Sequence, residues 1–403
     1  MPHKPFEASA QSLRALLDLP RYSVLRVERW SGWGRLTLEA RVAWFRCPVC
    51  RVVGPGRRAR WRVVRDLDVG RRHIELALRV YRSGCAACGR PEIPATLARS
   101  YARCTKRLEK HLFRLTRDST VKAVAQRMKL DWESVKDAEV RYIRGLLRKR
   151  DLRRIRRIGI DEVSYEKGHK YLTLVTDLER HRVIYATHGN DSRAIGRFVR
   201  WLGPERCQQI RVVVTDMHDP YLKGLRAGLK SAALVFDHFH VSKVVHNALD
   251  EIRRRIQREL SPADRRVIKG QRYVLLRARE NLTRKQNVSL GELLKANTDL
   301  TAGYILKEAF RDVFNAPTLR TGRKQLNQWE RQVLESAVPE LIDVLKTIEN
   351  RRSGIEAFFR YGVSNGMAEG FNNVVGTIKK QAYGFHDREY LQLKILRICG
   401  KIE

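Results

Sequence analysis

The sequence predicts a multidomain α+β protein, in which a cysteine-containing β domain and a helical segment precede an α/β core interrupted by helices. Three observations lead to this fold class. Two C-x2-C pairs lie among strand-like stretches before residue 100. Two strand-like runs contain several Val and Ile residues, at 157–163 and 210–215. The first contains Asp161, and Asp216 follows the second directly. Between residues 244 and 355, helical spacing replaces strand patterns.

Length and charge indicate the kind of partner. The chain has 403 residues, which is enough for two or three domains, and 81 Lys and Arg against 44 Asp and Glu, a net charge of +37. Such an excess favours nucleic acid over an anionic membrane or a ribosomal setting. No apolar run approaches the roughly 18 residues of a membrane helix, and no apolar signal sequence begins the chain. We therefore expect a cytoplasmic protein without a membrane partner.

The first domain, residues 1–100, is predicted to be a zinc ribbon. Strand-like residues 22–28 and 36–42 flank a Ser-Gly-Trp-Gly turn, which predicts a hairpin. Two cysteine knuckles follow, separated by 34 residues that contain strand-like pieces at 63–69 and 73–81. Four thiolates complete a tetrahedral shell, so the expected ion is one structural Zn2+; the alternative is reduced, buried thiols. The expected ligands are Cys47, Cys50, Cys85 and Cys88.

Residues 101–152 are predicted to form a helix-turn-helix domain. Val121, Val124, Ala125 and Met128 give an apolar stripe, and Asp131 is placed to cap a second helix. An ordinary helical hairpin with a charged face fits the same pattern, and the 19 Lys and Arg against 7 Asp and Glu over residues 101–157 favour DNA binding. The basic linker that follows either tracks a phosphate backbone or is a solvated connection. Its candidate DNA contacts are Arg153, Arg154, Arg156 and Arg157.

The order of elements after residue 153 is three strands, helix, strand, helix, strand. This order is typical of a ribonuclease H-like α/β sheet. We assign residues 153–243 to its first part, 244–355 to an all-helical insertion, and 356–403 to its second part.

Three carboxylates in this core suit phosphodiester chemistry. In such a sheet Asp161 and Asp216 would end neighbouring central strands, and Glu369 lies at the head of a late helix. Two close carboxylates repel unless a cation lies between them, and Mg2+ or Mn2+ prefers such oxygen ligands. The pattern therefore predicts two catalytic ions held by three residues. Taken singly, a strand-end aspartate is more often a cap or turn residue.

Other polar residues surround these carboxylates. Asp237 and His240 either support the metal site or contact the scissile phosphate, or else are a strand-end cap and a packed histidine. A polar helix face around Glu369 either touches DNA or is solvated. Trp329, in the insertion, either stacks on an unpaired base or, as its more frequent role, packs between helices. The candidate DNA contacts near Glu369 are Asn365, Asn372, Asn373, Lys379 and Lys380.

These stretches resemble the sequence blocks of one enzyme family. The blocks are Gly159-Ile160-Asp161-Glu162-Val163-Ser164 with Lys167-Gly168-His169, Val214-Thr215-Asp216-Met217, Phe236-Asp237-x-Phe239-His240, and Ser364-Asn365-Gly366-x-x-Glu369-Gly370-Phe371-Asn372-Asn373 with Ala382-Tyr383-Gly384-Phe385. They are similar to the catalytic blocks of DDE-class transposases of bacterial insertion sequences, specifically the ISL-three family. The resemblance covers nearly the whole chain.

The resemblance implies a function and a partner. It implies Asp161, Asp216 and Glu369 as the metal-binding triad, and N-terminal modules that recognise terminal inverted repeats on double-stranded DNA. One departure is that many related triads carry Lys or Arg seven residues after the Glu, where this chain has Gly376. We expect strand cleavage and strand transfer within a homodimer or larger synaptic complex. The alternatives are a non-catalytic DNA-binding repressor and a nuclease that performs no strand transfer.

Overall fold

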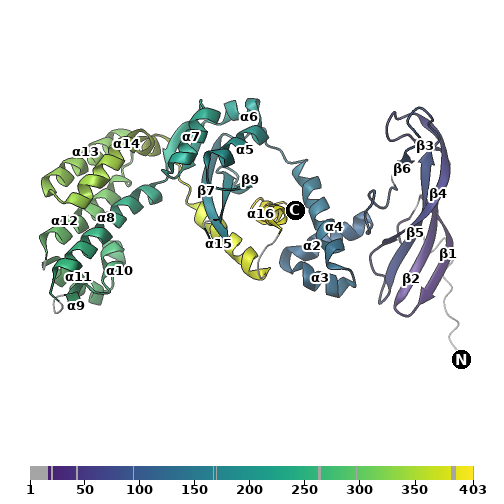
Figure 1. Cartoon of the computed structure of the whole chain (residues 1–403), viewed down its shortest axis with the longest axis horizontal. Coiled ribbons are helices and arrows are strands. Elements are labelled where there is room, and N and C mark those ends of the chain that lie inside the picture. Colours follow the sequence, from purple (N-terminus) through teal and green to yellow (C-terminus); the bar gives the residue numbers. More distant parts are fainter. Residues whose placement is uncertain are drawn as a thin grey trace. The chain divides into compact units, whose positions relative to one another are not determined.

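The structure is a computed structural model that describes residues 17–19, 21–41, 44–93, 95–166, 168, 170–261, 265–295, 297–382 and 387–402. It divides into two compact units, Met1–Arg150 and Asp151–Glu403, which we treat separately (Figure 1). Of the residues that carried the family resemblance, Lys167, His169 and Tyr383–Phe385 lie outside the described ranges. The finer domain bounds inferred from the sequence stay a prediction.

The first unit begins with a six-stranded sheet. Its strand order is β1-β2-β5-β4-β3, and β6 pairs with β5. One side of the sheet carries Leu36, Leu38, Leu76 and Leu78, which pack with Leu19 into a buried core. The strands are β1 (Tyr22–Trp30), β2 (Trp33–Ala40), β3 (Trp44–Arg46), β4 (Val53–Arg65), β5 (His73–Ser83) and β6 (Glu92–Ile93).

The hairpin expected at the start of this sheet is present as β1 and β2, which pair antiparallel. The strand predicted over residues 63–69 has the wrong bounds. Strand β4 begins at Val53, ten residues before the predicted start, and ends at Arg65. Its first half is rich in Gly and Arg and lacks apolar alternation, so the sequence pattern concealed it. Backbone pairing with β3 and β5 nevertheless holds it in the sheet.

Three helices follow, namely α2 (Lys106–Asp118), α3 (Val121–Met128) and α4 (Trp132–Leu147). Thr120 caps α3, and Asp131 caps α4 by accepting a hydrogen bond from the Ser134 amide at 2.7 Å. Between them Lys129 adopts a left-handed conformation with φ 53°, which closes the tight turn. The apolar stripe of α3 is buried as the sequence indicated.

Buried ion pairs join α2 to α4 and to the end of β4 within this unit. Glu109 of α2 is fully buried between Arg99 and Arg141, at 3.0 and 2.9 Å. Asp66, which follows β4 and is also fully buried, accepts a 2.6 Å hydrogen bond from Thr105 and pairs with Arg107. Removing one partner would leave a buried charge unpaired, so these contacts fix α2 against the end of β4.

The second unit is built on a five-stranded sheet with order β11-β10-β7-β8-β9. Strands β7, β8 and β9 are antiparallel neighbours, whereas β10 runs parallel to both β7 and β11. The strands are β7 (Arg157–Glu166), β8 (Lys170–Asp177), β9 (Arg182–His188), β10 (Val212–Thr215) and β11 (Ala233–Phe236). Helices interrupt them at α5 (Ser192–Leu202), α6 (Pro204–Gln209) and α7 (Asp219–Gly228).

Both faces of this sheet are covered. Residues of α5 and α7, including Phe198 and Leu225, pack on one face with Ile158 and Val213. On the other face lie α15 (Met367–Gln381) and α16 (Arg388–Ile398), whose Val375 and Ile395 contact strand residues such as Leu172. Burial on both sides explains why β10 reads as a continuous run of Val and Thr.

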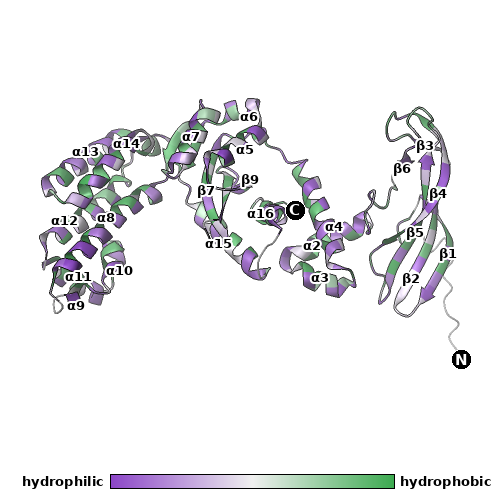
Figure 2. Cartoon of the chain, in the orientation of Figure 1, coloured by the Kyte–Doolittle hydropathy of each residue, from purple (hydrophilic) through white to green (hydrophobic). Residues whose placement is uncertain are grey.

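Between β11 and α15 lies an all-helical segment with its own core. Phe310, Trp329 and Leu341 are among its buried residues, and Figure 2 shows both hydrophobic and hydrophilic residues along α13 and α14. None of the described helices is long and apolar enough to cross a bilayer. The elements are α8 (His238–Glu259), α9 (Arg265–Ile268), α10 (Arg272–Leu276), η1 (Arg279–Asn281), α11 (Arg284–Lys295), α12 (Thr298–Val313), α13 (Leu319–Ser336) and α14 (Pro339–Tyr361).

Trp329 packs inside this helical segment. The side chain is 1% exposed, and its Nε1 donates a 2.9 Å hydrogen bond to the Leu306 carbonyl. Its ring therefore has no open face on which a base could stack, and the base-stacking role considered from the sequence is wrong in this structure. Packing between helices, the alternative, is what the indole does.

We expect Trp329→Ala to destabilise the second unit by about 3–5 kcal/mol, because it leaves a large cavity in the core and an unpaired Leu306 carbonyl. Urea denaturation followed by circular dichroism would measure the loss. Trp201→Ala is the matched control, since Trp201 is 42% exposed. Equal effects of the two substitutions would contradict the assignment of Trp329 to the core.

Candidate active site

The ends of three parallel strands bring three aspartates to one edge of the sheet. The last β7–β10 pair is Gly159 with Val214, so Asp161 and Asp216 each lie two residues beyond it. The last β10–β11 pair is Thr215 with Phe236, so Asp216 and Asp237 each lie one residue beyond it. Register therefore aligns the three carboxylates across β7, β10 and β11.

Asp161 lies inside β7, which continues to Glu166 while pairing only with β8. The strand was expected to end at this carboxylate; instead, only its parallel pairing with β10 ends just before it. Burial raises the pKa of Asp161, and the charge of Asp216 adds to the rise, while a hydrogen bond from Asn372 and the charge of His240 oppose it. The carboxylate is thus held where its negative charge is poorly compensated, which is a setting that favours a bound cation.

Helix α15 and the residues just before it supply two amides to this edge, Asn372 from the helix and Asn365 from the preceding segment. Asn372 Nδ2 donates to Asp161 Oδ2 at 2.9 Å, and Asn365 Nδ2 donates to the Ile160 carbonyl at 3.4 Å. A Cβ at residue 159 would collide with the Asn365 side chain, so Gly159 permits this close approach. The remaining Oδ1 atoms of Asn365 and Asn372 are buried without a hydrogen-bond partner among the described residues. Such orphaned oxygens fit a site that gains a further polar ligand.

Glu369 lies in the first turn of α15 and is exposed, and so is Asn373. Glu369 lies three residues before Asn372, so both project from one side of the helix. Among the described residues, only the four cysteines bring three or more possible metal-ligand atoms within 4.8 Å of one another. Asp161, Asp216 and Glu369 do not form such a group.

Asp237 and His240 form a charged pair beside the aspartates. Asp237 is buried, and its carboxylate oxygens lie 3.5 Å from His238 Nδ1 and 3.5 Å from His240 Nδ1. Burial alone would raise the pKa of Asp237, but pairing with these histidines outweighs it and holds the pKa well below its usual range. The pairing raises the pKa of His240, to which the charges of Asp161 and Asp216 also contribute. The carboxylates around His240 therefore favour its charged form.

The predicted basic DNA contacts differ in their surroundings. Lys379 Nζ donates to the Ser164 carbonyl of β7 at 3.0 Å, and Lys380 is exposed. Arg153 pairs with Asp151 at 3.1 Å, and Arg157 lies 3.8 Å from Glu179. Arg154 and Arg156 are exposed between α4 and β7. Lys379 thus holds α15 to β7, whereas Lys380, Arg154 and Arg156 offer accessible charge.

The four cysteine sulfurs of the first unit form one cluster. All lie within 4.8 Å of one another, and Cys50 Sγ is 3.6 Å from Cys85 Sγ. Sulfurs bound tetrahedrally at about 2.3 Å from an ion are about 3.8 Å apart. Backbone N–H groups, chiefly that of Cys50, lower the pKa of Cys47 to about 6, which favours a thiolate. The cluster can therefore hold a metal ion.

Two features of this site were not inferred from the sequence. Asn190 Nδ2 donates to Glu162 Oε2 at 2.7 Å, which ties the loop after β9 to the strand that carries Asp161. Phe239 is 60% exposed between the two histidines that pair with Asp237. An exposed large apolar side chain inside a polar block was the available signal for Phe239. No sequence pattern pointed to Asn190.

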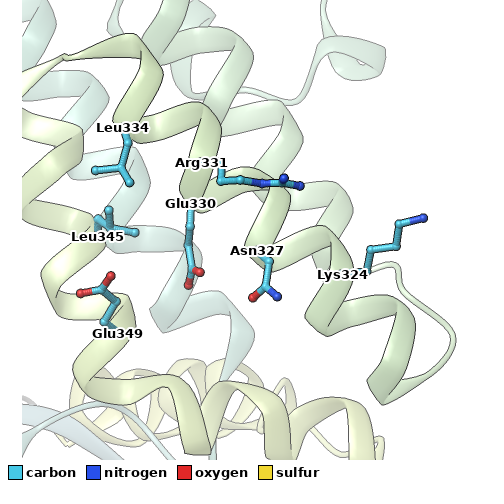
Figure 3. A pocket seen from close by; sticks show the side chains of 7 residues that line it. All are labelled: Lys324, Asn327, Glu330, Arg331, Leu334, Leu345 and Glu349. Atoms are coloured by element: carbon cyan, nitrogen blue, oxygen red, sulfur yellow. The ribbon is translucent and has the colours of Figure 1, made fainter.

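A cavity of about 520 Å³ lies between α13 and α14 of the helical segment (Figure 3). Its walls are mostly polar, and none of them is a predicted site residue. It is lined by Lys324, Asn327, Glu330, Arg331, Leu334, Leu345 and Glu349.

Comparisons with known proteins agree on one family. A family model described as "Transposase" matches residues 158–395, and one described as "Helix-turn-helix domain of transposase family ISL3" matches residues 94–143. The chain is 34% identical over 340 residues to the transposase for insertion sequence element IS1001 of Bordetella parapertussis, which covers 83% of each chain. It is 28% identical over 387 residues to the transposase for insertion sequence element IS1557 of Mycobacterium tuberculosis, over 88% of this chain and 86% of that one.

The raised pKa of Asp161 has a consequence for stability. A carboxyl whose pKa is higher in the folded chain costs stability once pH exceeds its unfolded value, about 3.9. We therefore expect Asp161→Asn to raise Tm by a few degrees at neutral pH without divalent metal, and to lose this advantage below about pH 4. Thermal unfolding across pH measures the effect. Asp343→Asn, at an exposed carboxylate, is the control and should leave Tm unchanged. A gain in Tm for Asp161→Asn that was the same at every pH would contradict this explanation.

Proposed function

Because the chain belongs to the ISL3 family of transposases, we propose that it binds the terminal inverted repeats of an insertion sequence and catalyses metal-dependent DNA strand cleavage and strand transfer. The observation that carries this proposal is the row of aspartates at the ends of β7, β10 and β11. We also propose that the sheet is ribonuclease H-like, on the strength of its strand order and its covered faces.

Asp161, Asp216 and Glu369 are the residues we propose to hold two Mg2+ or Mn2+ ions. Their hard oxygen atoms suit such ions, and the raised pKa of Asp161 reflects a carboxylate that lacks a compensating cation. When bound, the ions would activate the attacking oxygen and stabilise the leaving one. Glu369, exposed on the first turn of α15, is free to turn toward the aspartates when a cation removes their repulsion.

The other residues position these ligands and the DNA. Asn372 orients the Asp161 carboxylate, and Asp237 favours the protonated form of His240, which would contact the scissile phosphate. A water attacks the phosphodiester at each element end, forming one P–O bond and breaking another, which frees a 3′-OH. That hydroxyl attacks the target strand in a second in-line displacement. Lys380, Arg154 and Arg156, with Asn373, are placed to contact the DNA backbone.

DNA recognition belongs to the first unit in this proposal. Helix α4 is the second helix of the helix-turn-helix, so its exposed N-terminal residues Trp132 and Glu133, with the half-exposed Lys136, are the ones that would meet base edges. A Zn2+ ion held by Cys47, Cys50, Cys85 and Cys88 would fix the ends of β3 and β5. Both element ends must be held together, so we propose a homodimer or larger synaptic complex.

The second candidate function is a DNA-binding repressor that keeps the fold without the chemistry. The observation that favours it is that, among the described residues, Asp161, Asp216 and Glu369 are not gathered into one group of possible ligand atoms as the four cysteines are. A nuclease without strand transfer would use the same carboxylates. Both alternatives are separated from the main proposal by their products.

We expect Asp216→Asn to lower Mg2+- or Mn2+-dependent cleavage and joining of terminal-repeat DNA by at least about a thousandfold, because the ions contribute several kcal/mol to the transition state. Labelled donor and target DNA resolved on denaturing gels would measure both steps. Glu369→Gln should behave in the same way, whereas Asp219→Asn, at an exposed carboxylate on α7, should retain activity.

The products distinguish the alternatives. Nicked donor without joined product from the wild type would favour the nuclease. Tight binding without cleavage by any protein would favour the repressor. Equal activity of wild type and Asp216→Asn would show that Asp216 is not in the active site.

We expect one zinc ion per chain, and we expect Cys50→Ser to lose it together with at least about tenfold in affinity for terminal-repeat DNA. Cleavage of non-specific DNA by the second unit should change little, since the cysteines belong to the other compact unit. Atomic absorption and fluorescence anisotropy would measure the two effects. Cys207→Ser, at a buried cysteine of the second unit, is the matched control and should keep its zinc; full zinc content in Cys50→Ser would count against the site.

A further inference from the structure

The β domain at the start of the chain has an unusual composition. Residues 21–93 contain 17 Arg and no Lys, against 6 Asp and Glu, and include four of the seven Trp of the chain. Arg differs from Lys in offering a flat guanidinium that stacks on rings and forks onto phosphate. A domain rich in Arg and Trp but without Lys is therefore better suited to binding nucleic acid than to solubility alone.

Strand alternation places three of these tryptophans on one side of the sheet. Trp30 pairs with Trp33, and Trp33 pairs with His73, so these rings occupy one row across β1, β2 and β5. Trp61 of β4 pairs with Arg79, six residues further along β5 on the same side. The leucine core lies on the other side. We call the side that carries Trp30, Trp33, Trp61, Arg35 and Arg79 the open face.

The open face is accessible and its rings are held by arginines. Trp30 is 42% exposed and Trp61 is 39% exposed. The guanidinium of Arg79 lies 3.8 Å from the centre of the Trp61 ring, and that of Arg35 lies 5.4 Å from the Trp30 ring. These cation–π contacts fix the rings in place before any ligand arrives.

Charge on the open face favours a polyanion. Its carboxylates Glu28 and Glu75 are each paired with an arginine, Arg26 at 3.3 Å and Arg35 at 2.6 Å. The Arg79 side chain, by contrast, has no ion pair or hydrogen-bond acceptor among the described residues; its Nε is buried, so its terminal nitrogens are the ones that would meet a ligand. An arginine that is stacked on a ring but short of an acceptor is suited to a phosphate oxygen.

We propose that the open face binds single-stranded DNA, with bases stacked on Trp30 and Trp61 and phosphates held by Arg79 and its neighbours. A flat sheet face cannot enter a duplex groove, which admits a helix or a narrow ribbon. Unpaired bases, in contrast, can splay onto aromatic rings that lie on a sheet. The two ring positions are about 20 Å apart along β5, a span of a few nucleotides.

The test is binding of fluorescein-labelled short poly(dT) to the full chain, followed by anisotropy without added divalent metal. We expect Trp30→Ala/Trp61→Ala to lower the affinity at least tenfold, since loss of one stacking ring typically costs about that much. Affinity for a duplex of the terminal repeat should change less than threefold. Trp44→Ala is the matched control, because Trp44 is 64% exposed, pairs with Pro55 and points to the other side of the sheet.

A second variant guards against loss of fold. Val63→Glu adds a carboxylate to the open face at a residue that is 46% exposed, so the sheet tolerates it while phosphates are repelled. It should also weaken poly(dT) binding, with an unchanged circular dichroism spectrum. Binding of poly(dT) at wild-type strength by both variants would overturn the proposal. Equal losses for poly(dT) and duplex would overturn it too, since the surface would then serve duplex DNA. Because no cleavage is measured, the result is independent of the proposed chemistry.

Discussion

Mutual repulsion among Asp161, Asp216 and Asp237 is the constraint on which the second unit depends. Three parallel strands end side by side, and their register leaves these carboxylates at one edge. The fold compensates two of them unequally: the two histidines beside Asp237 more than offset its burial, whereas Asp161 has one amide from α15 and keeps a raised pKa. Asp216 receives hydrogen bonds from the His218 amide and the Thr215 hydroxyl, at 3.2 and 3.5 Å. A sheet that concentrates charge in this way gains from a cation, and this is the physical basis of the proposed chemistry.

The neighbouring elements are arranged around that edge. Asn365, just before α15, can approach β7 closely because Gly159 has no side chain, and Lys379 anchors the far end of α15 to the Ser164 carbonyl. The helical segment leaves the sheet at Asp237 and returns through α14, whose Gly354 packs against Phe236 of β11. The same strand end therefore starts the insertion and supports the carboxylates.

The sequence predicted those features of the fold and of the candidate site that depend on a few neighbouring residues. Paired cysteines, the Thr120 and Asp131 caps and the apolar β10 run each depend on a few adjacent residues, and the structure agrees with them. The all-helical insertion was predicted without its internal boundaries, which the structure sets where Asn297 caps α12 and where Ala337, with φ 53°, ends α13 before Pro339. The first half of β4 and the Asn190–Glu162 contact depend on partners distant in sequence, which local patterns do not contain. The exposed position of Glu369 likewise depends on how α15 docks, and only the three-dimensional arrangement determines it.

The contact between Asn372 and Asp161 joins residues 211 positions apart. During synthesis, the first unit and the strands of the sheet leave the ribosome well before α15 does, and contacts of long sequence separation form slowly. A nascent or prematurely terminated chain would therefore contain the helix-turn-helix while the proposed active site still lacked α15, which carries Glu369 and Asn372. In the proposed function, such fragments would bind element ends without cutting them.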